Sequence, residues 1–383
     1  MLLPENIRYV GVDDHDIDLF EGLYPAPQGM SYNSYVLLDE KVAVLDPVDA
    51  RFGDTWLEKV HNALGSRQPD YLIVHHMEPD HSANLARFMQ VYPTATVVAS
   101  DKAFTMMKAY FGQDYADRRR IVREGDQLPL GQHTLTFIAA PMVHWPEVMM
   151  SYEQTTGTFF SADAFGKFGA LDVENPWRDE ARRYYFGIVG KYGAQVQTVL
   201  KKAAALPLQR ICPLHGPVLT GHAMGEAIAL YKAWSAYEAE SDGIVIAYAS
   251  IYGNLKAAAL ALADTLTARG RQVVLHDLCR DDVYATVADA FRCGKLVLAS
   301  VTYNSDVLPP MRTLIHHLVS RGYQGRTVAL MEAGSWAPMA AKVMRELLAP
   351  CKSLILPEES VRILGAMNES TPPQLTALAD RLC

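Results

Sequence analysis

The sequence predicts an α/β protein of two domains. With 383 residues, the chain is longer than one hydrophobic core usually supports. Apolar segments of strand length alternate with helical segments, which is typical of layered α/β folds. A polar break at Ser241-Asp-Gly243 follows a long helical segment, predicted at 221–240, and precedes a buried-type strand. We therefore expect the domains to cover residues 1–242 and 243–383.

Strands and helices alternate through the first half of the first domain. In chain order we predict two strands within 31–47 joined by a polar turn at 39–41, a helix at 54–64, a strand at 71–75, a helix at 81–89 and a strand at 94–100.

The composition is that of an ordinary soluble enzyme. Half of the residues are apolar, about a fifth are charged, and the formal net charge is -8. No run of Lys or Arg stands out, which argues against a nucleic-acid partner. The N-terminus lacks a signal-peptide core and no apolar stretch is long enough to span a bilayer. The five cysteines (212, 279, 293, 351 and 383) are scattered, so we expect reduced thiols and a cytoplasmic setting.

A cluster of possible metal ligands follows the strand at 71–75. It consists of His76, Glu78, Asp80 and His81. Residues two apart in an extended segment point the same way, so the first three can converge on one point if the chain stays extended past the strand end. Any one of them alone is more often a solvated or hydrogen-bonded residue. Four imidazole or carboxylate groups so close together predict metal binding.

Three further candidate ligands, His144, Asp163 and His215, each follow their own predicted strand, where a scaffold usually places its chemistry. Asp163 alone would be a capping residue. With the cluster, however, the set has four imidazoles and three carboxylates, more than a closed zinc site needs. It predicts two metals that share a carboxylate. Mixed ligands with open positions favour redox iron or manganese, and paired metals can hold a small substrate.

The second domain begins with a strand, a loop and a helix start that together form a possible anion-binding site. A strand at 244–249 leads into Ser250-Ile-Tyr-Gly-Asn-Leu255, and a helix is expected over 256–269. The free N–H groups and the dipole of such a helix start bind phosphate. The absence of GxxxxGK and GxGxxG argues against a nucleoside triphosphate loop and a dinucleotide fingerprint.

Two later strand ends fit the same sheet. Strands at 295–300 and 326–331 run into loops that carry Tyr303 and Trp336. Either aromatic residue alone is more often part of a core. With a phosphate loop they favour a flavodoxin-like doubly wound sheet with FMN at the carboxyl ends of its strands. The predicted FMN-binding residues are Ser250, Ile251, Tyr252, Gly253, Asn254, Leu255, Val301, Thr302, Tyr303, Asn304, Ala333, Gly334, Ser335 and Trp336.

The ligand motifs resemble those of a known family. His-x-Glu-x-Asp-His, Pro-Met-Val-His-Trp-Pro, Ser-Ala-Asp-Ala-Phe-Gly and Cys-Pro-Leu-His-Gly-Pro look like the diiron domain of flavodiiron proteins, also called A-type flavoproteins. This resemblance implies the αββα sandwich of the metallo-β-lactamase fold. Hydrolytic relatives such as glyoxalase II usually carry His-x-His-x-Asp-His and bind zinc. Glu78 stands in place of their second histidine, and a harder anionic ligand is consistent with iron.

The resemblance also implies a ligand assignment. One iron would take His76, Glu78 and His144, the other would take Asp80, His81 and His215, and Asp163 would bridge them. His75 is expected to point to the opposite side of the strand and to serve packing or support.

The resemblance extends over essentially the whole chain. Ser-Ile-Tyr-Gly-Asn resembles the family's phosphate loop, and Thr-Tyr-Asn followed by Leu-Pro-Pro-Met resembles its first isoalloxazine loop. Leu255 replaces a frequent Thr, so backbone N–H groups are expected to bind phosphate there. Ala333-Gly-Ser-Trp differs from the Ser-Tyr-Gly-Trp-like form.

The resemblance implies an oxidoreductase in which FMN passes electrons to a non-haem diiron centre. That centre would reduce dioxygen to water, nitric oxide to nitrous oxide, or both, as detoxification. A head-to-tail homodimer or a dimer of dimers is implied, with the flavin of one chain serving the irons of another. Because the chain has no Cys-x-x-Cys pair, we expect no fused rubredoxin. A separate donor would then supply electrons, either rubredoxin or a reduced cofactor such as a deazaflavin.

Three alternatives remain open at this point. A zinc hydrolase of the lactamase family with an appended flavodoxin module would contain zinc alone and cleave esters or lactams. A non-catalytic diiron oxygen sensor would not need the electron supply that an FMN domain provides. A plain flavodoxin-type carrier with an inactive first domain is disfavoured by the complete ligand set.

Overall fold

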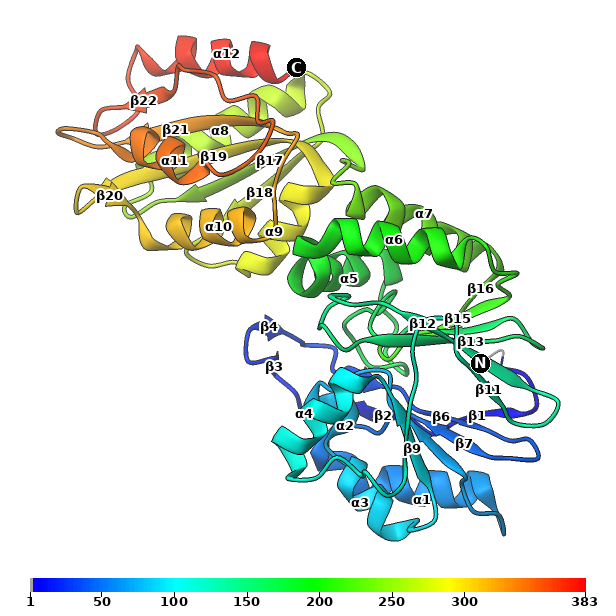
Figure 1. The fold of residues 1–383 in the computed structure, drawn as a ribbon. Helices are drawn as coiled ribbons and strands as arrows, with labels where there is room; N and C mark the ends of the chain where they lie inside the picture. The colour runs from blue at the N-terminus through cyan, green and yellow to red at the C-terminus, as the bar shows by residue number, and fades with distance from the viewer. Residues whose placement is uncertain (1–2) are drawn as a thin grey trace. The chain divides into compact units, whose positions relative to one another are not determined.

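The computed structural model of the protein describes residues 3–383 (Figure 1). The chain divides into two compact units, of which the first ends at Ser235 and the second is Ala236–Cys383. The predicted domain limit between residues 242 and 243 falls inside strand β17 (Ser241–Ala249).

Two six-stranded sheets form the centre of the first unit. One has the order β1-β6-β7-β8-β9-β10, and the other runs β11 to β16 in chain order. The strands of the first are β1 (Ile7–Tyr9), β6 (Tyr35–Leu37), β7 (Ala43–Leu45), β8 (Tyr71–Ile73), β9 (Thr96–Ala99) and β10 (Arg119–Ile121). Those of the second are β11 (Gln127–Pro129), β12 (Thr134–Ala139), β13 (Met149–Glu153), β14 (Thr158–Phe160), β15 (Arg210–Cys212) and β16 (Leu219–Thr220).

Helices cover the outer face of each sheet (Figure 1). The helices α1 to α4 lie beside the first sheet and α5 to α7 beside the second, which gives an αββα sandwich. Their bounds are α1 (Gly53–Leu64), α2 (Pro79–Ser82), α3 (Leu85–Val91), α4 (Asp101–Phe111), α5 (Trp177–Tyr184), α6 (Gly193–Ala203) and α7 (Gly221–Ser235). The remaining elements are β2 (Val12–Asp14), β3 (Leu19–Phe20), β4 (Tyr24–Pro25), β5 (Met30–Tyr32), the 3-10 helices η1 (Ala50–Phe52) and η3 (Gly190–Tyr192), and the π-helix η2 (Tyr185–Val189).

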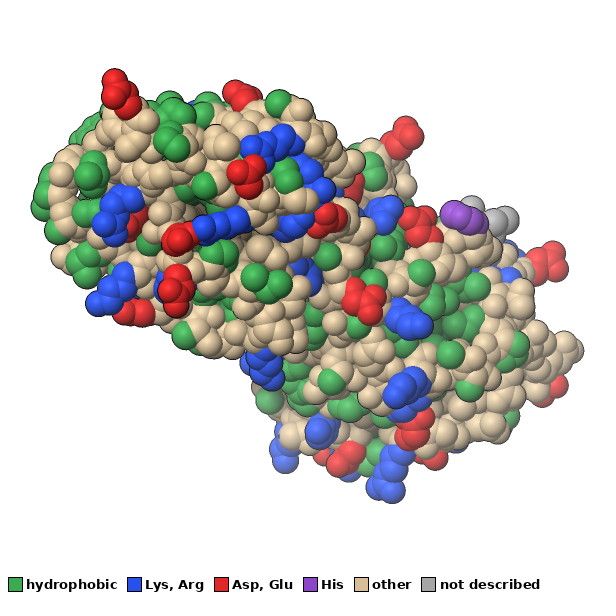
Figure 2. All heavy atoms as spheres, turned by 90° about the horizontal axis from the view of Figure 1, so that it is seen from above, with side chains coloured by type: hydrophobic (Ala, Val, Ile, Leu, Met, Phe, Trp, Pro, Cys, Tyr) green, Lys and Arg blue, Asp and Glu red, His purple; other side chains and the backbone are tan. Residues whose placement is uncertain are grey.

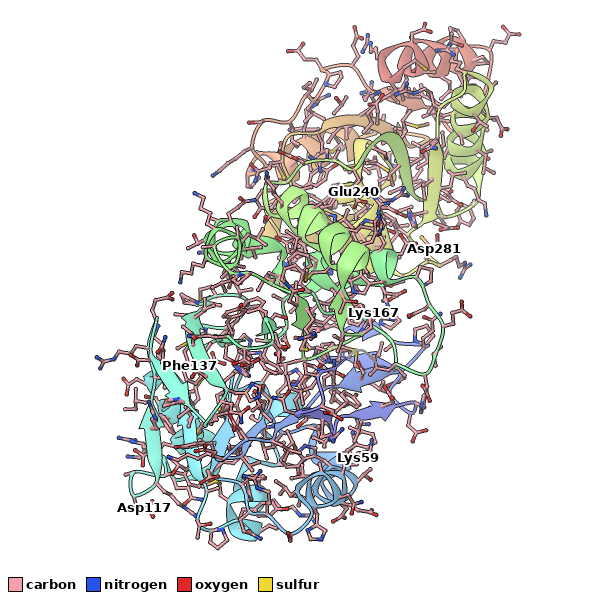
Figure 3. The ribbon with its side chains drawn as sticks, turned by 90° about the vertical axis from the view of Figure 1, so that its right-hand side faces the viewer. Lys59, Asp117, Phe137, Lys167, Glu240 and Asp281 are labelled. Carbon is pink, nitrogen blue, oxygen red and sulfur yellow. The ribbon has the colours of Figure 1, made fainter. Side chains whose placement is uncertain are left out.

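The two sheets bury their facing sides against each other. Leu45 and Ile73 of the first sheet share one core with Phe137 (Figure 3) and Phe160 of the second. Since successive strand residues point to opposite faces, the other sides of the strands face the helices. The loops that leave one end of this sandwich carry the candidate metal ligands.

A parallel sheet forms the second unit, in the order β18-β17-β19-β21-β22. This is the 2-1-3-4-5 order of flavodoxin-like doubly wound sheets. The helices α8 and α12 share a core with one face, and α9 to α11 lie on the other (Figure 1). The bounds are α8 (Asn254–Ala268), β18 (Val273–Asp277), α9 (Val283–Arg292), β19 (Cys293–Tyr303), β20 (Asp306–Val307), α10 (Pro309–Ser320), β21 (Thr327–Ala333), α11 (Ala340–Leu348), β22 (Val361–Ile363) and α12 (Thr371–Leu382).

The helix predicted at residues 81–89 is wrong as a single element, because the structure divides it into α2 and α3. The side-chain amide of Asn84 lies at the break and donates to the backbone oxygens of Val48 and Asp49, at 2.9 and 2.8 Å. These partners are distant in the sequence, so local periodicity could not reveal them.

Other predicted element limits shift for local reasons. The helix predicted at 221–240 ends at Ser235, and Tyr237 has φ of +60°, which cannot continue a helix. Strand β19 continues to Tyr303, three residues beyond the predicted limit, because β20 pairs with its end. Helix α8 begins at Asn254 instead of residue 256.

No helix within residues 3–383 combines the length and the apolar character that crossing a membrane requires. None of the five cysteines forms a disulfide within the described residues.

Candidate functional site

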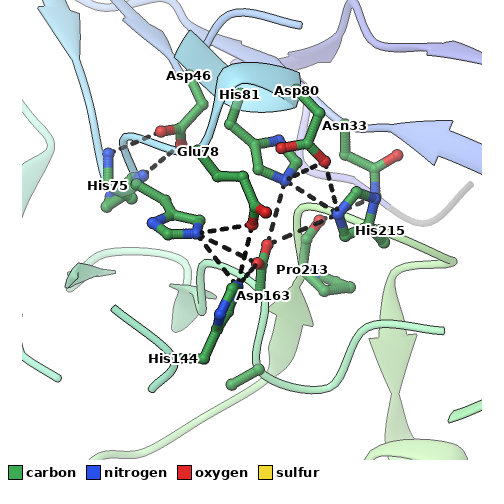
Figure 4. A network of polar contacts seen from close by, with 12 residues as sticks. Asn33, Asp46, His75, Glu78, Asp80, His81, His144, Asp163, Pro213 and His215 are labelled. Atoms are coloured by element: carbon green, nitrogen blue, oxygen red, sulfur yellow. Dashed lines mark hydrogen bonds and ion pairs between the residues drawn. The ribbon is translucent and has the colours of Figure 1, made fainter. Parts of the chain in front are cut away.

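The seven predicted ligands lie together in two adjoining groups (Figure 4). One group is His76, Glu78, His144 and Asp163, and the other is Asp80, His81 and His215. The strands β8, β12, β14 and β15 end just before the loops or the helix that carry them. The loops therefore bring residues far apart in the sequence to one place.

The carboxylate of Asp163 lies between the two groups. Its Oδ2 is 3.0 Å from His144 Nε2 and 3.5 Å from His76 Nε2. Its Oδ1 is 3.2 Å from His81 Nε2 and 3.8 Å from His215 Nε2. Each oxygen therefore faces a different pair of imidazoles, as a bridging carboxylate requires.

The spacing of the ligand atoms suits metal ions. Nε2 of His76 lies 3.3 Å from that of His144 and 3.2 Å from Glu78 Oε2. Nε2 of His81 lies 3.0 Å from that of His215, and both are 3.3 Å from Asp80 Oδ2. Ligands bound at about 2.0–2.2 Å are separated by roughly 2.8–3.6 Å across octahedral and tetrahedral geometries. The donor set and its spacing therefore fit two metal ions.

Hydrogen bonds orient two of the imidazoles. His76 Nδ1 donates to Glu147 Oε1 at 2.8 Å, and His215 Nδ1 donates to the backbone oxygen of Ser31 at 2.7 Å. With Nδ1 protonated in each neutral ring, the lone pair lies on Nε2 and faces the group. Both oxygens of Asp80 are buried without a hydrogen-bond partner among the described residues, as expected of atoms that hold a metal.

His76, Glu78 and Asp80 do not converge on one point, because the condition for it, an extended chain past the strand end, is not met. His76 and Glu78 lie in one group and Asp80 in the other. The chain does not stay extended, because α2 begins at Pro79, where proline favours the first turn of a helix. That turn carries Asp80 and His81 to the second group, with His215.

The pKa shifts within the cluster show that its buried carboxylates require positive charge nearby. Burial lowers the pKa of His144, but hydrogen bonds to Asp163 and Glu78 outweigh burial and raise it to about 9. Burial likewise lowers the pKa of His76, but the charge of Asp163 and the Glu147 hydrogen bond raise it well above its usual value. Burial raises the pKa of Asp163, but the charges of His81 and His76 hold it well below its usual range. Protonated imidazoles in the metal-free protein thus supply the positive charge that the carboxylates require.

A cavity of about 410 Å³ reaches the carboxylates of Glu78 and Asp80, and Phe20, Glu21 and Tyr32 also line it. Glu21 is an exposed residue, and partial desolvation of its carboxyl and the neighbouring charge of Glu78 raise its pKa above the ordinary value. The cavity has room for small molecules to reach the ligand groups.

The sequence reading missed residues that support the ligands. Glu147 also accepts from the backbone N–H of Met77 at 2.9 Å. Its position three residues after His144 was a usable signal, because a histidine that binds metal usually donates to a carboxylate or carbonyl. The rings of Phe20, Tyr32 and Tyr184 lie 5.4–5.9 Å from that of His215, and no local pattern identified these contacts.

A second cavity, of about 390 Å³, lies at the carboxyl ends of β17, β19 and β21 in the second unit. Gly253 has φ of +91° and precedes α8, so the first N–H groups of this helix are available to an anion. The hydroxyl of Ser250 is buried with no hydrogen-bond partner in the described chain. Thr302 Oγ1 accepts from the backbone N–H of Met339 at 2.8 Å. This bond holds the loop after β21 against the end of β19.

Most of the predicted FMN-binding residues line this cavity, but Ile251, Gly253 and Tyr303 are not among its lining residues. Tyr303 instead pairs with Asp306 in the β19–β20 hairpin. Tyr252 and Trp336, which do line it, are 93% and 82% exposed and are free to cover a flat ring. The lining residues that the sequence reading missed are Ser305, Ala337, Met339 and Gly365.

Known proteins are similar to this chain in sequence and in fold. The family model described as "ODP family beta lactamase" matches residues 30–216. A nitric oxide reductase of Moorella thermoacetica is 30% identical over 93% of this chain and 91% of its own length. The flavodiiron protein of Giardia intestinalis is 25% identical, with a TM-score of 0.89 over 100% of this chain and 98% of its own. The rubredoxin oxygen:oxidoreductase of Desulfovibrio gigas, 24% identical, shares the fold with a TM-score of 0.92 over 100% and 97% of the two chains.

Both halves of the chain are therefore those of a two-domain flavoprotein with a lactamase-type sandwich. The chain belongs to the flavodiiron protein family. The predicted fold class, a metallo-β-lactamase-like αββα sandwich followed by a flavodoxin-like sheet, is confirmed.

The protonated imidazoles predict that metal binding depends on pH. Because a metal binds the neutral form of histidine, binding must release the proton that His144 holds below about pH 9. The association constant for Co²⁺ should therefore rise at least about tenfold between pH 6.5 and 7.5. Anaerobic titration of the metal-free protein, followed by the visible spectrum of Co²⁺, measures it. A pH-independent constant would contradict the assignment.

The hydrogen bond from His76 to Glu147 predicts a role in metal affinity. Glu147→Gln keeps the shape of the side chain but removes its charge, and should weaken Co²⁺ binding about 10- to 100-fold at one of the two sites. Glu153→Gln is the matched control, since Glu153 is equally buried and accepts from His133 at 3.0 Å, outside both groups. Equal Co²⁺ affinities of the two variants would refute this role.

Proposed function

We propose that this protein is an oxidoreductase that passes electrons from FMN to a non-haem diiron site, where dioxygen is reduced to water, nitric oxide to nitrous oxide, or both. The observation that carries the proposal is the position of Asp163 between two groups of ligands, with one oxygen toward each. The printed names of relatives, nitric oxide reductase and anaerobic nitric oxide reductase flavorubredoxin, support this reaction class.

In this proposal residues 1–242 form the diiron domain. His76, Glu78 and His144 would hold one iron and Asp80, His81 and His215 the other, with Asp163 shared. When bound, the two irons supply electrons and open coordination positions for a diatomic molecule. The donors favour iron over zinc, because Glu78 is a harder, anionic ligand at a position where hydrolytic zinc-binding relatives carry histidine.

The protein's own residues prepare that site in two ways. Glu147 and the Ser31 carbonyl hold two imidazoles in the tautomer that ligation needs. Burial of His76, His81 and His215 keeps their ligand nitrogens out of bulk solvent.

Residues 243–383 form the FMN-binding domain in this proposal. The N–H groups at the start of α8 and the Ser250 hydroxyl would bind the phosphate. Val301, Thr302, Asn304 and the loop from Ala333 to Trp336 would hold the isoalloxazine ring, with Tyr252 and Trp336 placed to cover it. Ligands of doubly wound sheets bind at this end of the strands.

We propose a cytoplasmic head-to-tail homodimer, or a dimer of such dimers, that receives electrons from a separate donor. The absence of disulfides among the described cysteines supports a reducing compartment. The relatives named flavorubredoxin and rubredoxin oxygen:oxidoreductase support rubredoxin as that donor. Acidic and basic side chains are interspersed on the face shown in Figure 2, which is unlike a nucleic-acid-binding face.

Stopped-flow mixing of the fully reduced, iron-loaded protein with each gas tests the reaction. Nitric oxide or dioxygen should reoxidise FMN with a rate constant on the order of 1–10³ s⁻¹. Protein reconstituted with zinc is the matched control, because zinc keeps the charge of the site but cannot change its oxidation state. Equal rates in the iron and zinc forms, or a purified protein that contains zinc alone and cleaves esters or lactams, would refute the proposal.

The buried hydroxyl of Ser250 predicts a phosphate contact. Ser250→Ala should weaken FMN binding about tenfold, which corresponds to about 1.4 kcal/mol for one hydrogen bond to a charged group. Riboflavin, which lacks the phosphate, should bind both proteins equally. Fluorescence titration of the flavin-free protein measures both ligands. Ser320→Ala removes an exposed hydroxyl that donates to the His317 carbonyl and is the control. An equal effect on riboflavin would contradict the contact.

A further inference from the structure

The imidazole of His75 joins the two sheets of the sandwich. Its Nδ1 lies 2.5 Å from Asp46 Oδ2, and its Nε2 lies 2.8 Å from Ser151 Oγ (Figure 4 shows the Asp46 contact). Asp46 directly follows β7 and His75 follows β8, both in the first sheet, whereas Ser151 belongs to β13 of the second. One side chain thus spans the space between the sheets.

Backbone hydrogen bonds make this link rigid. The His75 N–H donates to Asp46 Oδ1 at 2.7 Å, and the His75 carbonyl accepts from the Met149 N–H at 3.0 Å. The ring lies nearly parallel to that of Phe160, at 17° and with centroids 6.3 Å apart. Contacts on both ring nitrogens and on a ring face leave the imidazole little freedom.

The combination of Ser, His and Asp suggests nucleophilic catalysis, but burial argues against it. Asp46 and His75 are 1% exposed and Ser151 is 0% exposed. A substrate cannot reach a hydroxyl that lies within the core of the sandwich. The network therefore serves the structure around it.

The residues that this link joins in the two sheets, His75 and the segment at 149–151, are each close in the chain to a metal ligand or to a residue that orients one. His75 precedes His76 in the chain, and Met149 lies two residues after Glu147, which accepts from His76 Nδ1. His76 and Glu78 belong to the loop after β8, whereas His144 and Asp163 belong to loops of the second sheet. The separation of the sheets at this point sets the distance between the ligands that each sheet supplies.

We propose that His75 is a positioning residue, whose imidazole fixes the separation of the two sheets and thereby the geometry of both metal positions. This inference rests on the proposed diiron function. The inference goes beyond that function, because it assigns the cross-sheet contact with Ser151 a measurable effect on metal affinity and on the distance between the metals. Groups that orient ligands in this way alter metal affinity about 10- to 100-fold.

Variants at His75 and Ser151 separate the two contacts. Asn at position 75 places its amide near the Nδ1 position and keeps the Asp46 contact, but is too short to reach Ser151. Gln reaches the Nε2 position and should restore the cross-sheet contact. Ser151→Ala removes the partner and leaves His75 in place. Ser34→Ala is the control, since Ser34 is equally buried and bonds Leu45 and Trp56 without crossing to the second sheet.

Co²⁺ binding to the full-length metal-free protein and the Co–Co distance from X-ray absorption are the readouts. His75→Asn and Ser151→Ala should weaken Co²⁺ binding about 10- to 100-fold and lengthen or broaden the Co–Co distance, and His75→Gln should recover part of the affinity. Ser34→Ala should lower Tm without altering either readout.

The outcomes distinguish this inference from the proposed function. If Ser151→Ala and the His75 variants lose stability as Ser34→Ala does, but bind Co²⁺ with the affinity and distance of the original protein, the positioning role is refuted. If His75→Asn does not fold, Ser151→Ala and His75→Gln still decide. Wild-type protein that binds two Co²⁺ ions, but whose iron form reduces neither gas, would refute only the proposed function.

Discussion

Repulsion among buried carboxylates is the constraint on which the site depends. Asp163 lies 1% exposed within 4 Å of four imidazole nitrogens, and Asp80 and Glu78 lie beside the same rings. Such a set of anions is costly to bury unless positive charge accompanies it. Protons on the imidazoles meet this need in the metal-free protein, and two divalent cations meet it when bound. The same demand that raises the pKa of His144 therefore drives metal binding.

The sandwich provides the rigidity that this arrangement requires. Ligands from the loops of both sheets can meet at fixed distances only if the sheets themselves keep a fixed separation. The shared apolar core sets this separation over most of the interface, and the His75 imidazole sets it beside the ligands. The parallel sheet of the second unit has a different role. Its strand ends and the start of α8 present backbone N–H groups that can bind an anion.

Local pattern predicted much of the fold and of the site. Each ligand follows a strand, and strand ends share an edge of a layered fold, so the seven residues could be chosen before their positions were known. The single helix at 81–89 was wrong, and His76, Glu78 and Asp80 do not share one point. The chain leaves the extended form where α2 begins at Pro79, and the helix is interrupted at Asn84, whose amide bonds residues of a distant loop. Tyr303 followed a predicted strand end, but the strand itself continued.

The sequence by itself determined which side chains have metal-binding and phosphate-binding chemistry, since residue type and spacing along the chain carry that information. It also determined much of the alternation of strands and helices in the two units. Only the tertiary structure decided which oxygen of Asp163 faces which imidazoles, and that Glu147, Ser31 and His75 support the ligands. The physical reason is that these relations join residues from different strands, and their distances are set by the packing of one sheet on another.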